Sequence, residues 1–303
     1  MRKKVILNVK EAKSKVTTLL LTGLMCCPMM SLAQNLQINV SDAQFTRQMM
    51  ERLIKEYNKV NPEFTATVVD TREKADASVS LSGQDDVNSI GRFAILPIAN
   101  SENELLRNKK VVKGLSNKLK HQIFVERDLL EELDAEEEGE KQLPGTVYSL
   151  TGSHAITTTL VARDLSITPN RVKGKKILGS EENLISAVRS HQDAIAFNVA
   201  SLAYDSNTYQ PVEGLTVLAT DLDGNGRISD EERSVISSLD KLTDYLDKLP
   251  HTGLPIGNIS IKTDNQELRR FVDWASTEGQ GYLSPYGFLK ANKALTAHLT
   301  AQK

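Results

Sequence analysis

Residues 147–164 read VYSLTGSHAITTTLVARD, a pattern that predicts a strand turning at Gly152 into the first turn of a helix. The first backbone amides of a helix lack partners within the helix and carry the positive end of its dipole, so such a junction can bind an anion. Four residues near the turn add hydroxyl groups: Thr151, Ser153, Thr157 and Thr158. Alone, the stretch also fits a buried helix that Ser153 merely caps.

Strands and helices alternate on both sides of this junction, which is typical of the α/β class. Apolar or alternating runs predict strands at 37–40, 64–69, 77–81, 91–100, 174–179 and 194–198. The run at 91–100, GRFAILPIAN, carries Pro97 and reads as a connection rather than as the middle of a sheet. The sequence therefore predicts two lobes with a cleft between them.

Each lobe is expected to be a mostly parallel sheet flanked by helices. Lobe I is predicted to comprise 35–97 and 259–303, and lobe II to comprise 98–258. The C-terminal helical region, from Leu268 to Leu283, is expected to pack back on lobe I. In open α/β sheets, ligands lie beyond the carboxyl ends of strands, so the polar loops after the first and third strands are expected to converge with the Gly152 turn.

The first 33 residues have the pattern of a secretory signal peptide. Lysines and arginines precede an apolar run from Val16 to Met30, and Ser31-Leu32-Ala33 supplies the small residues of a cleavage site. The run is short for a transmembrane helix, although an uncleaved anchor is an alternative. We therefore expect an exported, periplasmic protein cleaved near Ala33.

Removing this segment changes the charge and the cysteine content. The whole chain has a formal net charge of −2, and the segment takes six bases and one acid with it, which leaves 31 bases, 38 acids and a net charge of −7. An acidic exported protein is a poor candidate for nucleic-acid binding. Cys26 and Cys27 also leave, so the mature chain has no disulfide or cysteine metal site, and a lipid anchor on either is an alternative.

Residues 221–232, DLDGNGRISDEE, fit the twelve-residue EF-hand calcium loop. Oxygen ligands for Ca²⁺ are expected from Asp221, Asp223, Asn225, the backbone of Arg227, Ser229 and Glu232. Because 215–220 reads as a strand rather than as an entering helix, we expect the ion to stabilise lobe II rather than to serve a calcium sensor. An acidic turn without an ion is the alternative.

Several stretches resemble the substrate-binding proteins of phosphate ABC transporters, which have the type II periplasmic binding fold. The likeness is carried by VSDAQFTRQMMERLIKEYNKVNP (40–62), ADASVSLSG (75–83), RFAILPIAN (92–100), KILGSEENLISAVRSHQDAIAFN (176–198) and LRRFVDWASTEGQGYLSPYGF (268–288). The segment YDSNTYQPVEGLTVLATDLDGNGRISDEE (204–232) also looks like a branch of that family that carries a calcium loop.

The resemblance implies an anion held between the lobes by three loops. By position, the implied contacts are Ala43, Gln44 and Phe45 in the first loop, Ser82 in the second, and Thr151, Gly152, Ser153 and His154 in the turn. The turn departs from the family's Ser-Gly-Thr, because His154 replaces the glycine and Ala155 replaces the threonine. Ser149 stands where an arginine usually precedes the turn, which removes a bidentate partner for an oxyanion.

We therefore expect a monomeric, non-enzymatic solute-binding protein that captures phosphate or a related small oxyanion for the permease of a membrane ABC transporter, with a hinge at 94–100. The alternative is a calcium-stabilised exported binding or scaffold protein that has lost the anion site. Catalysis is not expected, because the Gly-x-Ser-x-Gly elbow is absent and the five histidines show no metal-ligand spacing. A DNA-binding regulator is disfavoured by the export signal.

Overall fold

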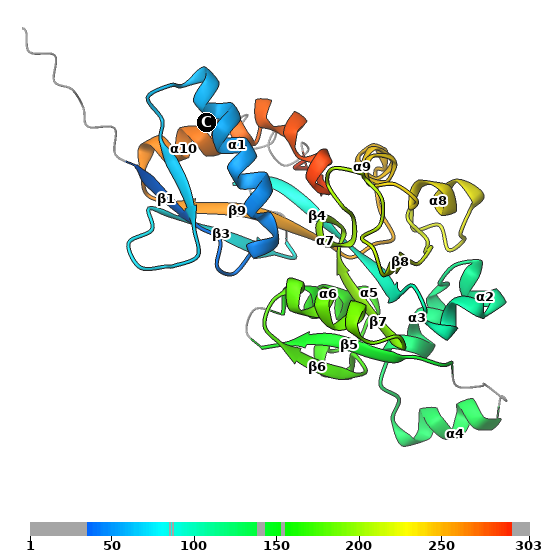
Figure 1. Cartoon of the computed structure of the whole chain (residues 1–303). Coiled ribbons are helices and arrows are strands. Elements are labelled where there is room, and N and C mark those ends of the chain that lie inside the picture. Colours follow the sequence, from blue (N-terminus) through cyan, green and yellow to red (C-terminus); the bar gives the residue numbers. More distant parts are fainter. Residues whose placement is uncertain (1–34, 85, 87, 138–142, 153–154, 293–303) are drawn as a thin grey trace, which may run out of the picture. The chain divides into compact units, whose positions relative to one another are not determined.

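The computed structural model describes residues 35–84, 86, 88–137, 143–152 and 155–292 (Figure 1). The described strands are β1 (Leu36–Asn39), β2 (Ala66–Val69), β3 (Ala77–Ser82), β4 (Ser89–Asn100), β5 (Thr146–Thr151), β6 (Lys175–Leu178), β7 (Ala194–Val199), β8 (Leu215–Val217), β9 (Ile256–Thr263) and β10 (Phe288–Leu289). The α-helices are α1 (Arg47–Val60), α2 (Lys109–Val112), α3 (Asn117–Phe124), α4 (Leu129–Glu137), α5 (Ile156–Asp164), α6 (Glu181–Ser190), α7 (Ala200–Ala203), α8 (Asp230–Val235), α9 (Leu239–Lys248) and α10 (Gln266–Ala275). Short 3₁₀ helices are η1 (Gln44–Thr46), η2 (Glu104–Arg107), η3 (Pro169–Arg171), η4 (Glu278–Tyr282) and η5 (Ser284–Tyr286).

The described strands form one continuous sheet in the order β2-β1-β3-β9-β4-β7-β5-β6, and β8 and β10 also pair with β4. The outer pairs are parallel, since β1 pairs with β2 and β3, and β5 pairs with β6 and β7. The pairs that involve β4 or β9 are antiparallel. The predicted α/β class is confirmed, and its parallel units lie on either side of an antiparallel centre.

Strand β4 joins the two sides of the sheet, because its first half pairs with β9 and its second half with β7. The expectation that 91–100 lies away from the middle of a sheet is wrong, since β4 is central in the strand order. Pro97 is accommodated because the ladder to β8 ends at Ile98. The Pro97 carbonyl accepts the Leu218 N–H at 2.9 Å, and proline needs no acceptor in return.

The predicted lobe boundaries fall inside two neighbouring strands of this centre. The boundary at 97–98 lies within β4, and the boundary at 258–259 lies within β9. These strands pair with each other from Ser89 to Ala94 on β4. The division into lobes stays a prediction.

The C-terminal helix α10 packs against α1, as the sequence predicts (Figure 1). The ring of Tyr57 on α1 lies 5.5 Å from Phe271 and 5.3 Å from Trp274 on α10, measured between centroids. Phe64, which follows α1, stacks on Phe271 at 5.4 Å. This aromatic cluster closes the side of the sheet formed by the outer strands β1 to β3.

The export signal predicted at 1–33 lies outside the described residues, as do Ser153 and His154 of the predicted turn. Within the described residues, α1 is the longest helix, with 14 residues. None of the described helices is both long and apolar enough to span a lipid bilayer.

Gly257 of β9 lies opposite Phe93 of β4 in the sheet. A Cβ atom on Gly257 would lie 2.1 Å from the ring of Phe93, which is fully buried. We expect Gly257→Ala to lower the free energy of unfolding by about 1–3 kcal/mol, the usual cost of overpacking a core. Urea denaturation of the purified variant measures this change.

Gly281→Ala is the matched control, because no atom lies within 4 Å of a Cβ at that position. Phe93→Leu in the Gly257→Ala background should restore part of the lost stability, since the smaller side chain leaves room for the added methyl group. Equal unfolding midpoints for Gly257→Ala and Gly281→Ala would contradict this account of the packing.

Candidate functional site

The turn predicted at Gly152 forms where β5 ends and α5 begins. Thr151 is the last residue of β5, and Ile156 is the first of α5. Gly152 has a φ of +110°, a conformation that glycine adopts without the strain a side chain would cause. Both Thr151 and Gly152 are exposed, so this end of β5 is open to solvent.

The first turn of α5 has backbone amides without a partner among the described residues. The Ala155 N–H donates to the Gly152 carbonyl at 3.3 Å. The N–H groups of Ile156, Thr157 and Thr158 donate to none of the described residues. These amides lie at the positive end of the helix dipole, which favours an anion.

The threonine hydroxyls expected beside the turn are used inside the protein. Thr157 Oγ1 donates to the Glu181 carboxylate at 3.0 Å, and Thr158 Oγ1 donates to the Leu150 carbonyl at 2.8 Å. Both threonines are buried. They fix α5 to α6 and to β5, and they leave the backbone amides as the donors of the turn.

A cavity of about 1220 Å³ lies beside this turn. Gly152, Ala155, Ile156 and Thr159 line it from the α5 side, and the strands β3 and β9 line it from the other. The turn thus faces strands β3 and β9 across this cavity.

The charged residues around this cavity are of both signs. Its carboxylates are Asp42, Asp76, Asp264 and Asp273, and its cations are Arg72, Lys262 and Arg269. Arg72 forms an ion pair with Asp42, and Arg269 forms one with Asp264 at 3.4 Å. Lys262 forms no ion pair with any described residue. The cavity therefore has no excess of positive charge among its described lining residues.

The first and second predicted loops lie next to this cavity, and their named residues are not among those that line it. Ala43 is fully buried, and the ring of Phe45 packs 5.3 Å from Phe93. Gln44 is exposed, and the N–H groups of Gln44 and Phe45 donate to no described residue. Ser82 Oγ donates to the carbonyl of the nearby residue 84 at 2.6 Å.

Several residues that line the cavity were missed by sequence reasoning. Ser78 and Ser80 of β3 and Lys262 of β9 are among them. In β3, a serine recurs at every second position, which places these hydroxyls on one face of the strand. The alternation was visible in the sequence, but the facing strand β9 was not, because its pairing with β3 joins residues far apart in the chain.

A lysine lies beside Ser149, the position at which the resemblance predicted the loss of an arginine. Ser149 of β5 is paired in register with Lys176 of β6. Lys176 Nζ donates to Ser149 Oγ at 3.1 Å and also to the Val172 carbonyl. Burial lowers the pKa of Lys176 below its ordinary value. The lysine is held by these neutral acceptors, and neither Ser149 nor Lys176 is among the residues that line the cavity.

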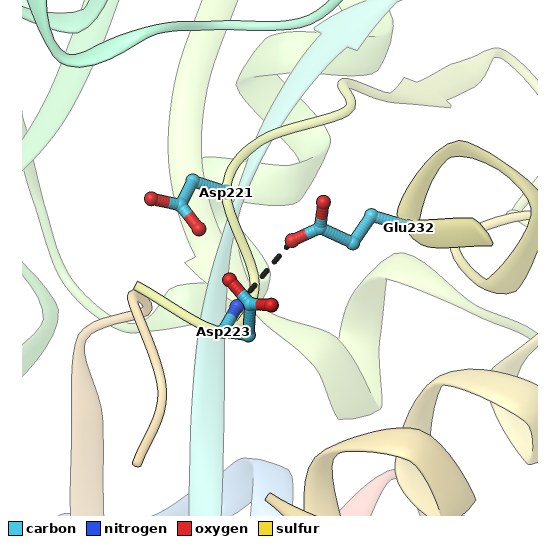
Figure 2. A group of neighbouring side chains, drawn as sticks. All are labelled: Asp221, Asp223 and Glu232. Atoms are coloured by element: carbon cyan, nitrogen blue, oxygen red, sulfur yellow. Dashed lines mark hydrogen bonds between the residues drawn. The ribbon is translucent and has the colours of Figure 1, made fainter. Parts of the chain in front are cut away.

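The predicted calcium loop folds around its own carboxylates. Asp221 accepts the N–H groups of Gly224 and Gly226 at 2.8 and 2.7 Å. Glu232 accepts the Leu222 N–H at 2.6 Å and, at 3.4 Å, the Asp223 N–H (Figure 2). Asn225 Oδ1 accepts the Arg227 N–H at 2.9 Å, and Ser229 caps α8 by accepting the Glu232 N–H. The loop is therefore folded by hydrogen bonds that run to its own side-chain oxygens.

Three carboxylates of this loop converge. Each of Asp221, Asp223 and Glu232 offers an oxygen, and these oxygens lie within 4.8 Å of one another (Figure 2). Glu232 is fully buried, and Asp221 is only 6% exposed. Among the described residues, no lysine or arginine forms an ion pair with any of the three. Burial and the neighbouring Asp223 and Glu232 raise the pKa of Asp221. Such a set of hard oxygens fits Ca²⁺.

No model of a known protein family matches this chain, and a search of characterised proteins gives no match. Solved structures do match it in fold. One, described as a phosphate ABC transporter substrate-binding protein from Clostridium perfringens with bound phosphate, has a TM-score of 0.51 and 12% identity, and the match covers 85% of this chain and all of that one. An ABC-type phosphate transport receptor from Vibrio cholerae also matches, with a TM-score of 0.47 and 11% identity, over 84% of this chain and 99% of that one. PstS from Borrelia burgdorferi matches with a TM-score of 0.43 and 14% identity, over 84% of this chain and 98% of that one.

The first of these matches concerns the fold, because 12% identity is too low to transfer a function. The chain shares the fold of that solved structure, so the predicted α/β fold of the type II periplasmic binding kind is confirmed. The calcium branch of that family and the identity of the ligand stay predictions.

The carboxyl of Glu181, which accepts from Thr157 behind the turn, makes stability depend on pH. Burial raises its pKa from the ordinary 4.5 to about 7, against the lowering effect of its hydrogen bonds. Between these values the folded protein retains a proton that the unfolded chain has lost. Stability should therefore fall as the pH rises through this window, by roughly 3 kcal/mol in all.

Glu181→Gln should remove this contribution, because an amide does not titrate. Urea denaturation at several pH values from 4.5 to 7 measures it as the difference between the wild type and the variant. Glu213→Gln, at an exposed position, is the control and should leave the pH dependence unchanged. A difference between wild type and Glu181→Gln that is constant with pH would contradict the prediction.

Proposed function

We propose that this chain is an exported solute-binding protein that captures phosphate or a related small oxyanion and delivers it to the permease of an ABC transporter. The observation that carries the proposal is the Gly152 turn, where three amides of α5 have no described partner and where Gly152, Ala155 and Ile156 line a cavity of about 1220 Å³. The fold shared with a phosphate ABC transporter substrate-binding protein supports the same reading.

The proposed binding mode uses neutral donors rather than a fixed arginine. The amides of Gln44 and Phe45 on one side, and those of the α5 turn on the other, would each donate to the anion. Hydrogen bonds to a charged group contribute about 1.5–3 kcal/mol each, so a few such amides suffice for a specific site. Ser153, His154, Thr151 and Ser82 are the proposed side-chain contacts.

Delivery to a transporter requires the two lobes to close around the solute. We place the hinge at 94–100, within β4, because this strand pairs with both sides of the sheet. The protein is proposed to act as a monomer in the periplasm or an equivalent exported compartment. It is proposed to have no catalytic activity.

Titration calorimetry and thermal shift on the mature chain, with phosphate, sulfate, molybdate and carboxylates, test the ligand. We expect heat and a raised melting temperature with at least one oxyanion. Gly152→Ala should weaken binding about tenfold, because a side chain at φ +110° is strained and displaces the first amides of α5. Gly281→Ala should bind as the wild type does. No heat with any of these anions would defeat the proposal and favour the scaffold alternative.

We also propose that the loop 221–232 holds a structural Ca²⁺. The proposed ligands are Asp221, Asp223, Asn225, the carbonyl of Arg227, Ser229 and Glu232. The buried, converging carboxylates without a basic partner among the described residues support this ion. The bound ion would supply the positive charge that these carboxylates lack.

Calcium removal should lower stability without unfolding the protein. Ca²⁺ at roughly 100 times its Kd stabilises a folded protein by about 2.7 kcal/mol, and a chelator should remove this amount from the wild type. Asp223→Asn and Glu232→Gln should reduce or abolish the response to chelator, whereas Glu231→Gln, at an exposed position of the loop, should keep it. Titration with calcium chloride alone should give heat, and the absence of both responses in the wild type would refute the ion.

A further inference from the structure

A second pocket, of about 300 Å³, lies at the far end of α5 from the Gly152 turn. Arg92 of β4, Arg163 of α5 and His251 line it. Among its described lining residues none is acidic, in contrast to the large cavity. The pocket therefore gathers basic groups from three separate segments of the chain.

The register of the sheet places Arg92 in this pocket. Arg92 is paired with Asn258 of β9 on one side and with Leu289 of β10 on the other. Paired residues of antiparallel strands project from the same face, so the three side chains form one row, and all three line the pocket. Sequence patterns alone do not show this row, because β10 and β9 reach β4 from the C-terminal part of the chain.

Arg163 brings a charge that no described carboxylate neutralises. Its guanidinium donates to the Gly83 carbonyl and, at 3.4 Å, to the Ile256 carbonyl. Both acceptors are neutral, and Arg163 forms no ion pair with a described residue. These two bonds orient the guanidinium beside the pocket and leave its other N–H groups for a ligand.

Arg92 is only partly neutralised. Its Nε donates to the Lys290 carbonyl at 2.7 Å, and its Nη2 lies 3.8 Å from Asp247. Asp247 also lies 4.0 Å from Lys290 Nζ, so one carboxylate serves two cations. The described charges are thus three cations, on Arg92, Arg163 and Lys290, and one carboxylate, on Asp247. The pocket therefore has an excess of positive charge even without His251.

The walls of the pocket are suited to a charged ligand. Leu246 and Leu289 are buried and lower the local dielectric, which strengthens interactions with the arginines. Thr252 lies at the base, where its hydroxyl donates to the Leu222 carbonyl at 2.8 Å and accepts the Leu254 N–H at 3.1 Å. The segment that carries His251 is thus held in place.

We propose that this pocket binds a small inorganic oxyanion of the phosphate or sulfate type between Arg92, Arg163 and His251. Guanidinium groups bind such anions through paired N–H groups, and an imidazole beside them donates a further hydrogen bond when protonated. The site is separate from the Gly152 turn and does not depend on the function proposed for it. An anion there would connect α5 to β4 and to the segment before β9.

Histidine NMR on the mature chain, titrated with inorganic phosphate and separately with sulfate, tests the site. A bound anion should raise the pKa of His251, because it stabilises the imidazolium. The His251 signal is identified by its loss in His251→Gln. Arg163→Gln should weaken the anion affinity reported by His251 about tenfold, and Arg92→Gln should do the same, since each removes a charge-assisted partner.

Two controls separate this site from other anion binding. Gly152→Ala should leave the His251 response intact, so loss of binding at the turn and loss of binding here are distinguishable. Arg107→Gln, at an exposed arginine elsewhere, should also leave it intact. A His251 pKa that does not move with either anion would overturn the proposal. An equal response in Arg163→Gln and Arg107→Gln would indicate an adventitious ion only, and would overturn it as well.

Discussion

The backbone hydrogen bonds of β4 are the interaction on which the rest of this molecule depends. One strand pairs with β9 along its first half and with β7 along its second half. The Gly152 turn connects to β4 through β5 and β7, and the loop 221–232 follows β8, which pairs with β4 directly. Arg92 lies on β4 itself. Each candidate site is thus positioned relative to the same strand.

The uncharged amide donors of the Gly152 turn and the positive charge of Arg163 lie at different ends of helix α5. The turn offers amides and lies beside a cavity whose described charges are of both signs. Lys176 donates to Ser149 and Val172 and does not line that cavity. A guanidinium that pairs with no described carboxylate lies at the other end of α5, on Arg163. Helix α5 therefore presents two different kinds of anion donor, uncharged amides at its first turn and a full positive charge near its last.

Local sequence patterns predicted most of the helices and strands, whereas the pairing of strands distant in the sequence could not be predicted from them. The strand that turns at Gly152, the amphipathic helix α10 and the acidic loop 221–232 are all readable from neighbouring residues. The central place of β4 in the sheet was not readable in this way, because Pro97 is unusual within a sheet. The sheet tolerates Pro97 only because its pairing with the short strand β8 ends at Ile98. The row of Arg92, Asn258 and Leu289 requires the register of three strands, which no local pattern contains.

The Leu222 carbonyl accepts two hydrogen bonds, one from the Thr252 hydroxyl at 2.8 Å and one from the Gly253 N–H at 2.9 Å. Gly253 also lies so close to Asp221 and Gly224 that an added Cβ would stand 2.6 Å from the Asp221 carbonyl oxygen. The turn that leads into β9 is therefore held to the loop by one backbone N–H and one side-chain hydroxyl. Any motion that preserves these two hydrogen bonds carries the loop 221–232 along with the start of β9.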